Sequence, residues 1–433
     1  MKKGFRKIFC LLLAVSIASM INSCVIRSDE KLAIILINEK YGCINQKGKL
    51  VIPAIYDRIG MWSEGLASVM LNEKVGFIDV KGNQVIPLDY YVDCDWGEMP
   101  FFSEGLTAMN LNGAWGFIDR TGKEVIPFYY QEAGQFQEGL APVMNQGKWG
   151  FVNKIGKQVI GCKYKEITSF HNGFAVGKYI SFIRQMDRWQ IIDTTGREIS
   201  EIYNRKYYYI GSFSEGLAPI LIKQNCFDYD YGDVYKYGFI DTTGNVVVPI
   251  QYDYYLEGDA VFHTCFYEGL TKVSKGKYEF LKYGFIDKTG REVTPLKYDN
   301  ASDFNEGLAA VLLNEKLGFI NQNGEEVIPF IYDGVYTESG IEMFAGFREG
   351  LIAVEKDEKW GFIDRTGKII IPFKYDFANN FYEGLAYTSE GFIDKRGRVC
   401  IPMRLLQRYT NAPLDSYSIE NFVNVKNENK NIY

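Results

Sequence analysis

Short apolar runs separated by polar turns recur along most of this chain, with the spacing of paired β-strands. The clearest copy, residues 361–371, reads Gly-Phe-Ile-Asp-Arg-Thr-Gly-Lys-Ile-Ile-Ile and is followed by Pro372. Its two apolar runs flank a glycine-containing loop, which suits the left-handed residue of a short hairpin. We therefore predict a β-hairpin here and in the related copies, which begin at Gly42, Gly76, Gly116, Gly150, Gly238, Gly284, Gly318 and Gly391, with a degenerate copy at Gln190.

A third strand is predicted before each hairpin. The Glu-Gly-Leu motif at residues 306–308 opens an apolar run that continues to Leu313, and the next three residues, Asn-Glu-Lys, turn the chain into the hairpin. Within the hairpin the proline always follows the first glycine by eleven residues, as Pro53 follows Gly42, because hydrogen-bonded pairing tolerates no insert. The shortest complete repeat is about 34 residues.

These units predict an all-β fold for residues 32–402, a tandem array of about ten three-stranded β-meanders. A single meander has an apolar face that it cannot cover alone, so neighbouring copies must stack. The stack can be elongated and solenoid-like or, alternatively, closed into a propeller-like ring, and the sequence leaves both arrangements open. Residues 403–433 break the pattern and are predicted to be a terminal cap or a disordered tail.

The segments Lys148-Trp149-Gly150-Phe151-Val152 and 359–368, the latter followed by Ile-Pro-Phe-Lys-Tyr-Asp at 371–376, resemble the WG (KWG) repeat. The resemblance covers 32–402 and implies an all-β repeat array found in bacterial proteins, without implying a reaction. Other copies replace the tryptophan by Tyr, Val or Leu, so this position is predicted to serve packing. The copy at Gln190 lacks both the glycine and the proline, which argues against regular stacking there.

The N-terminus has the pattern of an export signal. Basic residues at 2–7 precede an apolar run, 8–21, which at about 14 residues is too short to span a bilayer. Ile21-Asn22-Ser23-Cys24 is similar to a bacterial lipobox, so we expect a signal peptide at 1–23, acylation of Cys24 and a short tether at 24–31. The acidic run at 28–31 resembles a sorting signal for the outer face of the outer membrane, which predicts a lipid-anchored envelope protein that is exposed at the cell surface.

Composition gives little sign of catalysis. The net charge is −6 and no basic cluster occurs, which argues against a nucleic-acid partner. The two histidines, His171 and His263, lie in different repeats without metal-ligand spacing, so we expect no metal and no cofactor. The Asp of Gly-Phe-Ile-Asp and the Glu of Glu-Gly-Leu recur in most copies, and such recurrence predicts bonds to turn backbone rather than one catalytic pair.

The cysteines are predicted to be mainly structural. Cys43, Cys162 and Cys400 occupy positions that are Phe or Ile in other copies, so they are expected in the core. Cys94, Cys226 and Cys265 lie in inserts, where an exported protein can form a disulfide, and Cys226–Cys265 is the candidate pair.

Acidic and tyrosine-rich inserts interrupt the central repeats, at 207–209, 227–233 and 252–255, and a related insert surrounds Trp96. Repeat scaffolds tolerate inserts on exposed loops, and loops carry recognition. The alternative is that these aromatic residues only pack the inserts onto the array. The run from Asp228 to Asp233 lacks the glutamate of a calcium loop. The predicted ligand-binding residues are Asp228, Tyr229, Asp230, Tyr231, Tyr254, Tyr255 and Trp96.

The sequence therefore predicts a non-enzymatic, lipid-anchored scaffold that binds a protein or a glycan through its central inserts. One alternative is a glycan-active enzyme that uses insert carboxylates, such as those of Asp93, Asp95, Asp228 and Asp230. The other is a purely structural envelope protein, in which the inserts would share no face.

Overall fold

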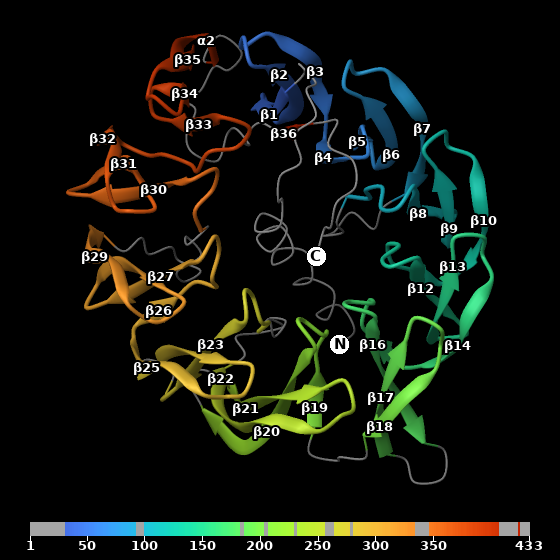
Figure 1. The fold of residues 1–433 in the computed structure, drawn as a ribbon. Helices are drawn as coiled ribbons and strands as arrows, with labels where there is room; N and C mark the ends of the chain where they lie inside the picture. Colours follow the sequence, from blue (N-terminus) through green and yellow to red (C-terminus); the bar gives the residue numbers. More distant parts are fainter. Residues whose placement is uncertain are drawn as a thin grey trace.

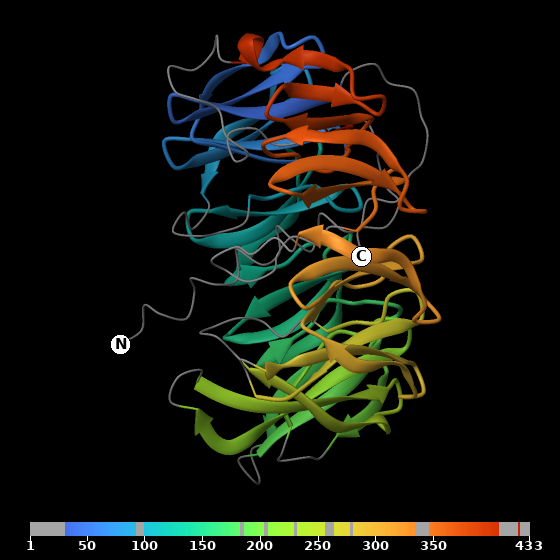
Figure 2. The ribbon, with the colours of Figure 1, turned by 90° about the vertical axis from the view of Figure 1, so that its left-hand side faces the viewer.

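The structure, a computed structural model, is a ring of small β-sheets (Figure 1). It describes residues 31–91, 99–181, 186–202, 207–228, 232–255, 264–277, 280–333, 346–406 and 423–424. Seen edge-on, the ring has strands that run across its thickness from one face to the other (Figure 2). Strand is the dominant element of the described chain, as the sequence predicts, and the short helix α2 (Met403–Leu406) follows the last repeat.

We call each repeat a blade and number the blades along the chain. Blades 1 to 5 are formed by β1 (Lys31–Ile37), β2 (Lys40–Asn45) and β3 (Leu50–Tyr56); β4 (Arg58–Ser63), β5 (Leu66–Leu71), β6 (Lys74–Asp79) and β7 (Gln84–Tyr91); β8 (Leu106–Leu111), β9 (Ala114–Asp119) and β10 (Glu124–Tyr130); β11 (Glu132–Ala133), β12 (Leu140–Asn145), β13 (Lys148–Asn153) and β14 (Gln158–Tyr164); and β15 (Glu166–Ile167), β16 (Phe174–Ser181), β17 (Met186–Asp193) and β18 (Glu198–Ile202).

Blades 6 to 10 continue in the same order. They are formed by β19 (Tyr207–Ile210), β20 (Leu217–Asp228), β21 (Gly232–Asp241) and β22 (Val246–Tyr255); β23 (Leu270–Lys275), β24 (Lys282–Asp287) and β25 (Glu292–Tyr298); β26 (Asn300–Ala301), β27 (Leu308–Leu313), β28 (Lys316–Asn321) and β29 (Glu326–Asp333); β30 (Leu351–Lys356), β31 (Lys359–Asp364) and β32 (Ile369–Tyr375); and β33 (Leu385–Thr388), β34 (Gly391–Asp394) and β35 (Val399–Pro402).

The predicted three-stranded meander is confirmed, with antiparallel pairing throughout. Both predicted turns have left-handed residues: Gly156 in the hairpin loop has φ 76°, and Asn314 and Glu315 have φ 51° and 63°. The sequence analysis missed a short extra strand that lies beside the first predicted strand in several blades, such as β11 beside β12. It is joined to that strand by the Glu-Gly turn, whose two residues have positive φ, as a tight primed hairpin turn requires.

Of the two arrangements that the sequence left open, the structure has the ring and not the elongated stack. One apolar cluster combines Ala33 and Ile44 of blade 1 with Tyr387 and Ile401 of blade 10 and with Leu406 of α2. In addition β36 (Val423–Asn424) pairs with β1, so a strand from the C-terminal segment completes the first blade. These contacts join the two ends of the array.

Packing between blades is also repetitive. The Phe of Gly-Phe-Ile-Asp in one blade contacts an aromatic residue that lies two positions before the Glu-Gly turn of the next blade. Phe151 and Phe170 are an example, with 4.7 Å between ring centroids, and equivalent pairs have separations up to 5.3 Å. Both rings are fully buried, and edge-on or tilted pairs of this kind add to the stability that burial provides. The recurring aromatic residue before Glu-Gly was the sequence signal for this contact.

The hairpin glycine lies opposite a bulge in the outer strand of the same blade. In blade 4, Trp149 pairs with Tyr164 and Phe151 with Ile160, so the outer strand bulges by two residues opposite Gly150. A Cβ at Gly150 would lie 2.5 Å from the carbonyl oxygen of Ile160. The glycine is therefore required because the bulge brings backbone against it.

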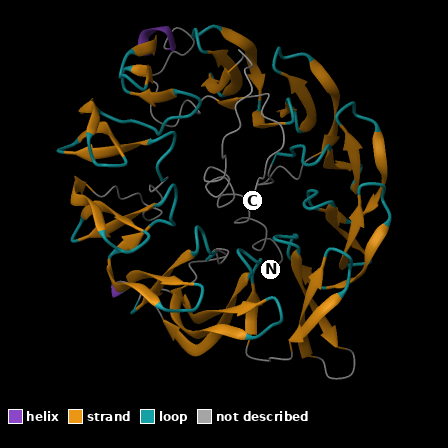
Figure 3. Cartoon of the chain, viewed as in Figure 1, coloured by secondary structure: helices purple, strands orange, loops and turns teal. Residues whose placement is uncertain are grey.

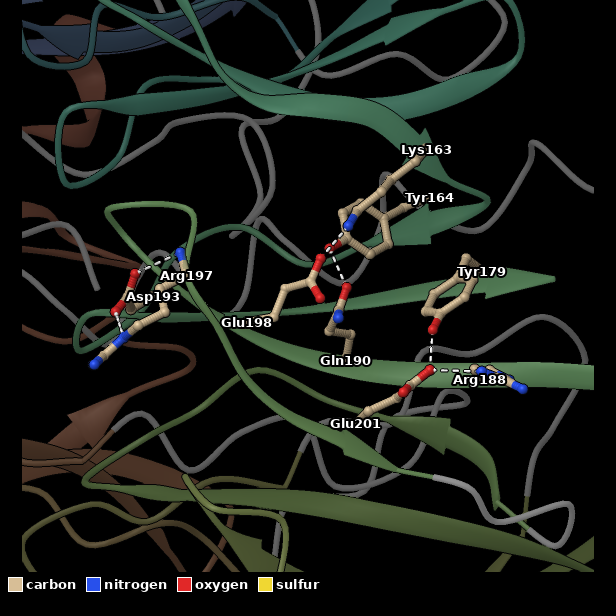
Figure 4. A network of polar contacts seen from close by, with 9 residues as sticks. All are labelled: Lys163, Tyr164, Tyr179, Arg188, Gln190, Asp193, Arg197, Glu198 and Glu201. Carbon is tan, nitrogen blue, oxygen red and sulfur yellow. Dashed lines mark hydrogen bonds and ion pairs between the residues drawn. The ribbon is translucent and has the colours of Figure 1, made fainter. Parts of the chain in front are cut away.

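Blade 5, the degenerate copy, packs between its neighbours as the other blades do, although its sequence argued against regular stacking. There Gln190 pairs directly with Glu201 and Ile191 with Ser200, so the two-residue bulge is missing together with the glycine and the proline. Without the bulge a long side chain fits: Gln190 is 3% exposed and its Oε1 accepts a 2.5 Å hydrogen bond from the Tyr164 hydroxyl of blade 4 (Figure 4). The loss of glycine is compensated by the loss of two residues from the outer strand.

Blade 4 has Gly161 where most other blades have proline. Its φ is not positive, and a Cβ there would meet nothing within 4 Å. We expect Gly161→Pro to raise the free energy of unfolding by about 0.5 kcal/mol, because it restricts the unfolded chain at a position that already suits proline. Chemical denaturation measures this, and a loss of stability would show that the Gly161 N–H has a necessary partner.

Candidate functional site

Every blade presents two kinds of turn, and each kind lies on its own face of the ring. The Glu-Gly turns and the hairpin loops with glycine lie at one end of the strands, and we call this the Glu-Gly face. The turns between the first strand of the meander and its hairpin, such as the turn at Asn314 and Glu315, lie at the other end together with the connections from one blade to the next, and we call this the turn face. These assignments follow from the antiparallel order of the strands.

On the Glu-Gly face the recurring Asp organises its own hairpin loop, as predicted. The Oδ1 of Asp287 accepts hydrogen bonds from the N–H of Thr289 and Arg291, at 2.9 and 3.1 Å, and from the Thr289 hydroxyl. These bonds, the Thr289 hydroxyl first, lower the pKa of Asp287 to about 2. Equivalent bonds lower the pKa of the same residue in other blades, namely Asp79, Asp119, Asp193, Asp241, Asp364 and Asp394.

This set predicts acid-sensitive stability. The folded-state pKa of each Asp lies below that of the unfolded chain, about 3.9, so the stabilisation is complete above that value and is lost as the pH falls toward the folded-state pKa. Unfolding free energies should decline steeply between about pH 4 and pH 2. Asp287→Asn should reduce that decline without unfolding the loop, because Asn153 accepts the same backbone bonds in blade 4. An unchanged pH slope in this variant would contradict the assignment.

The recurring Glu has a role that the sequence analysis only partly anticipated. It does bond turn backbone, but the backbone belongs to the next blade: Gly105 N–H donates to Glu64 at 2.9 Å, and Gly139 N–H donates to Glu104 at 3.0 Å. We call this contact the Glu clamp. The same contact joins Glu138 to Gly173, Glu215 to Gly269, Glu268 to Gly307 and Glu349 to Gly384.

A basic residue of the next blade reinforces several of these clamps. Lys154 lies 3.0 Å from Glu104, Lys288 lies 2.7 Å from Glu215, and Lys395 lies 2.9 Å from Glu349. Among the described residues the clamp is not formed between Glu306 and Gly350, nor between Asn172, which replaces the glutamate in blade 5, and Gly216.

On the turn face a second carboxylate links blades. Asp299, which follows the outer strand of blade 7, pairs with Lys282 of its own blade and accepts a 2.7 Å hydrogen bond from the N–H of Asn314 in blade 8. Asp57 and Asp333 make the corresponding contacts. The recurring carboxylates of both faces are therefore committed to holding turns and joints, which leaves them unsuited to acid–base chemistry.

The strand ends that the inserts connect lie on the turn face. Residues 92–98, 203–206, 256–263 and 334–345 connect the outer strand of one blade to the next blade, and residues 182–185 and 229–231 connect the first strand of a meander to its hairpin. Both kinds of connection join strand ends on the turn face. The Glu-Gly face has no comparable insert, since its hairpin loops keep one length.

Most of the predicted ligand-binding residues lie outside the described residues, namely Trp96, Tyr229, Asp230 and Tyr231, as do Asp93 and Asp95. Asp228 is described as the last residue of β20, on the turn face, and pairs in register with Gly232. The calcium-loop motif falls across the same gap. His263 is outside the described residues, whereas His171 lies beside a Glu-Gly-type turn, with its Nδ1 3.1 Å from Nε2 of Gln137.

Tyr254 and Tyr255 lie at the turn-face end of β22. Tyr254 pairs in register with Tyr235 and packs on the core cluster between blades 6 and 7, and burial raises its pKa to about 12. Tyr255 donates a 3.1 Å hydrogen bond from its hydroxyl to the carbonyl of Gly276 in blade 7. Tyr254 is therefore mainly a support, while the partly exposed Tyr255 bridges two blades at the surface.

Two exposed aromatic residues that the sequence analysis did not single out as binding residues extend this region. Tyr208, 51% exposed, lies with its ring centroid 5.0 Å from that of Tyr235. Phe280, 70% exposed, lies in the turn of blade 7 that also contains Gly276. We call Tyr208, Tyr255 and Phe280, together with Tyr254, the aromatic platform. Tyr208 is linked to Tyr254 through Tyr235, and Phe280 lies in the turn whose Gly276 accepts the hydrogen bond of Tyr255.

The cysteines only partly follow the sequence prediction. Cys43 is fully buried, but Cys162 is half-buried and Cys400 is exposed, so the core prediction is wrong for Cys400. It occupies the outward side of an outer strand, where Ile370 of blade 9 is also exposed. Cys265 is a free thiol, so the Cys226–Cys265 disulfide is not formed; the side chain of Cys226 lies outside the described residues.

Residues 1–30, with Cys24 and the predicted signal peptide and tether, lie outside the described residues. Among the described residues, no helix is long and apolar enough to cross a membrane. In the same part of the chain no group of three His, Cys, Asp or Glu side chains could hold a metal ion.

Comparison with known proteins bears on the scaffold. The family model described as "WG containing repeat" matches residues 41–74, 115–149, 149–176, 191–226, 237–278, 283–316, 318–360 and 360–389, which is more than half of the chain. The structure adds blades that the model does not match, such as the copy that begins at Gly76. No curated protein matches the chain.

Among solved structures, a crystal structure of a eukaryotic initiation factor is similar, with 11% identity, a TM-score of 0.52 and coverage of 83% of this chain and 98% of the other. The β-propeller domain of the Trilobed protease from Pyrococcus furiosus has 10% identity, a TM-score of 0.31 and coverage of 70% and 99%. At these identities the likeness concerns the fold alone.

Proposed function

Since the chain belongs to the WG containing repeat family, we propose that it is a non-enzymatic scaffold, lipid-anchored at a bacterial cell envelope, that binds a protein or glycan on its turn face. The observation that carries the proposal is that the strand ends joined by these inserts lie on that face, whereas the hairpin loops that the structure describes on the Glu-Gly face keep a constant length. Loops of variable length commonly carry recognition, so their restriction to one face favours a binding role over a purely structural one.

The aromatic platform also favours the turn face as the binding face of the ring. Tyr208, Tyr255 and Phe280 expose rigid rings that offer large contact area at low cost in conformational entropy. Asp253 lies below them, where it pairs with Lys236 and accepts a 3.1 Å hydrogen bond from Gly276 N–H. The platform is thus held in place by bonds between blades 6 and 7, which favours binding without rearrangement.

A binding role fits the carboxylates better than a glycan-active enzyme does. A glycosidase needs two carboxyl groups free to act on one bond. The recurring Asp and Glu accept backbone hydrogen bonds instead, and they do so in nearly identical surroundings from blade to blade. The proposed anchor at Cys24 rests on the lipobox-like sequence and on the apolar run before it.

The test uses residues 25–433, which contain every described element, immobilised and probed with a glycan array and with solubilised envelope proteins. The variant Tyr208→Ser/Tyr255→Ser/Phe280→Ser should lose binding of whichever ligand is captured. Ile155→Ser is the matched control, because Ile155 is 79% exposed in a hairpin loop on the Glu-Gly face. Equal binding by all three proteins would overturn the turn-face proposal, and hydrolysis of an arrayed glycan would favour the enzyme.

A further inference from the structure

An apolar stripe crosses the outer rim of three blades. It consists of Ile369 and Ile370 in blade 9, Val399 in blade 10, and Leu50 and Val51 in blade 1. Ile369 is 52% exposed, Val399 40% and Ile370 36%, and the two residues of blade 1 are partly exposed. In each blade a basic residue directly precedes the apolar pair or residue: Lys368, Arg398 and Lys49.

The first position of the stripe distinguishes these blades. Ile369, Val399 and Leu50 occupy the second residue after the hairpin-loop glycine. All other blades except blade 6, which has Val246, carry a polar side chain there: Gln84, Glu124, Gln158, Glu198, Glu292 and Glu326. The fold therefore accepts a polar residue at this position. Leu50 and Val51 pack partly against the core clusters of blade 1, so the exposed apolar surface of the stripe belongs mainly to Ile369, Ile370 and Val399.

The three segments lie side by side. A Cβ on Gly397, in the hairpin loop of blade 10, would lie 3.2 Å from the Ile371 side chain of blade 9, and one on Gly48 of blade 1 would lie 2.9 Å from the Ile401 side chain of blade 10. The shared core cluster of blades 10 and 1 continues the contact across the closure of the ring. The stripe residues therefore lie at equivalent positions on three consecutive blades of the ring.

The charges around the stripe are mainly basic on the exposed side. Lys47, Lys49, Lys368, Arg396 and Arg398 are all exposed. The neighbouring acids, Asp364 and Asp394, are used by hydrogen bonds within their own loops, and Asp394 also pairs with Arg398. Exposed aliphatic side chains flanked by Lys and Arg are the combination that binds the surface of an anionic lipid bilayer.

We propose that this stripe rests on an anionic membrane surface and orients the ring against it. Blade 1 is the blade that the chain enters first, and Cys24 precedes β1 by seven residues, which span at most about 25 Å. The lipid anchor proposed above would therefore keep blade 1, and with it the stripe, within reach of the bilayer. In this orientation the ring stands on its rim, and the turn face remains open to a ligand.

The test omits the anchor, so its result is independent of acylation at Cys24 and of any turn-face ligand. Residues 25–433 are floated with vesicles of phosphatidylcholine alone or mixed with phosphatidylglycerol. We expect binding to the mixed vesicles that falls with added salt, and a loss of about tenfold in the partition coefficient for Ile369→Gln/Val399→Gln. Gln is native at this position in blades 2 and 4, so the variant should fold.

Val246→Gln, the same change in blade 6, is the matched control and should bind like the parent protein. Equal vesicle binding by all three proteins, or no binding by the parent, would overturn the proposal. Analytical ultracentrifugation of the same proteins tests the alternative that a second copy of this chain binds the stripe. Self-association of the parent that Ile369→Gln/Val399→Gln abolishes, without vesicle binding, would assign the stripe to contact with a second copy of this chain.

Discussion

Gly238→Ala is expected to destabilise the protein by about 3 kcal/mol, because the added methyl group would meet backbone on the neighbouring strand. A Cβ at Gly238 would lie 2.4 Å from the carbonyl oxygen of Val248 and 2.8 Å from the backbone of Pro249. Backbone cannot move aside as a flexible side chain can, so either the two-residue bulge of β22 or its pairing with β21 must change. Equilibrium denaturation with urea measures the loss.

Two other substitutions in this chain serve as controls for Gly238→Ala. Gly161→Ala should be nearly neutral, because a Cβ at Gly161 meets nothing within 4 Å. Gln190→Gly should cost much less than Gly238→Ala, since blade 5 has no bulge for the glycine to accommodate and loses mainly the bond from Tyr164. If Gly238→Ala were as stable as Gly161→Ala, the coupling of glycine and bulge would be wrong.

Glu64→Asn is expected to lower the free energy of unfolding by about 2 kcal/mol. Glu64 is 4% exposed and its carboxylate accepts the 2.9 Å hydrogen bond from Gly105 N–H, so a shorter side chain leaves that N–H without its charged acceptor. Asparagine tolerates the positive φ of 51° at this position, as Asn172 does at 54°, so the variant isolates the clamp from backbone strain.

The reverse change gives the complementary result. Asn172→Glu should raise stability by about 1 kcal/mol, because it places a glutamate before Gly173 where it can reach Gly216 N–H of blade 6. Both variants are compared by denaturation under identical conditions. A loss of stability in Asn172→Glu, or no change in Glu64→Asn, would mean that the Glu clamp contributes nothing to the joints.

The hairpins, the third strand and the repeat boundaries could be predicted from sequence because each is local. A left-handed glycine such as Gly156, and apolar residues spaced for one buried face, carry their structural meaning within about ten residues. The bonding role of Asp287 was predictable for the same reason, since its partners, Thr289 and Arg291, lie two and four residues away.

Contacts between blades could not be predicted in this way. The partner of Glu104 is Gly139, 35 residues later, and its identity depends on how neighbouring blades are offset. Closure was equally hidden, because the pairing of β1 with β36 joins the two ends of the described chain. The doubt over blade 5 had a similar origin: the missing glycine is visible in the sequence, but the missing bulge that compensates for it appears only in the pairing of β17 and β18.

The binding role of the predicted site residues stays a prediction. The structure shows that Tyr255 is partly exposed and bonds the next blade, whereas Tyr254 packs against the core cluster between blades 6 and 7. Phe280 was missed because a single phenylalanine in a short turn has no distinguishing pattern, and it becomes a candidate only when Tyr255 is seen to bond the same turn.

The ring is the central claim, because the closure between blades 10 and 1 makes the blades of the apolar stripe neighbours and gives the molecule two distinct faces. Small-angle X-ray scattering of residues 25–433 tests it directly. A closed ring predicts a compact particle, with a radius of gyration of about 20 to 25 Å for a chain of this length. An open stack of ten sheets spaced by about 10 Å would be about 100 Å long, and a pair-distance distribution with that extended tail would contradict the ring.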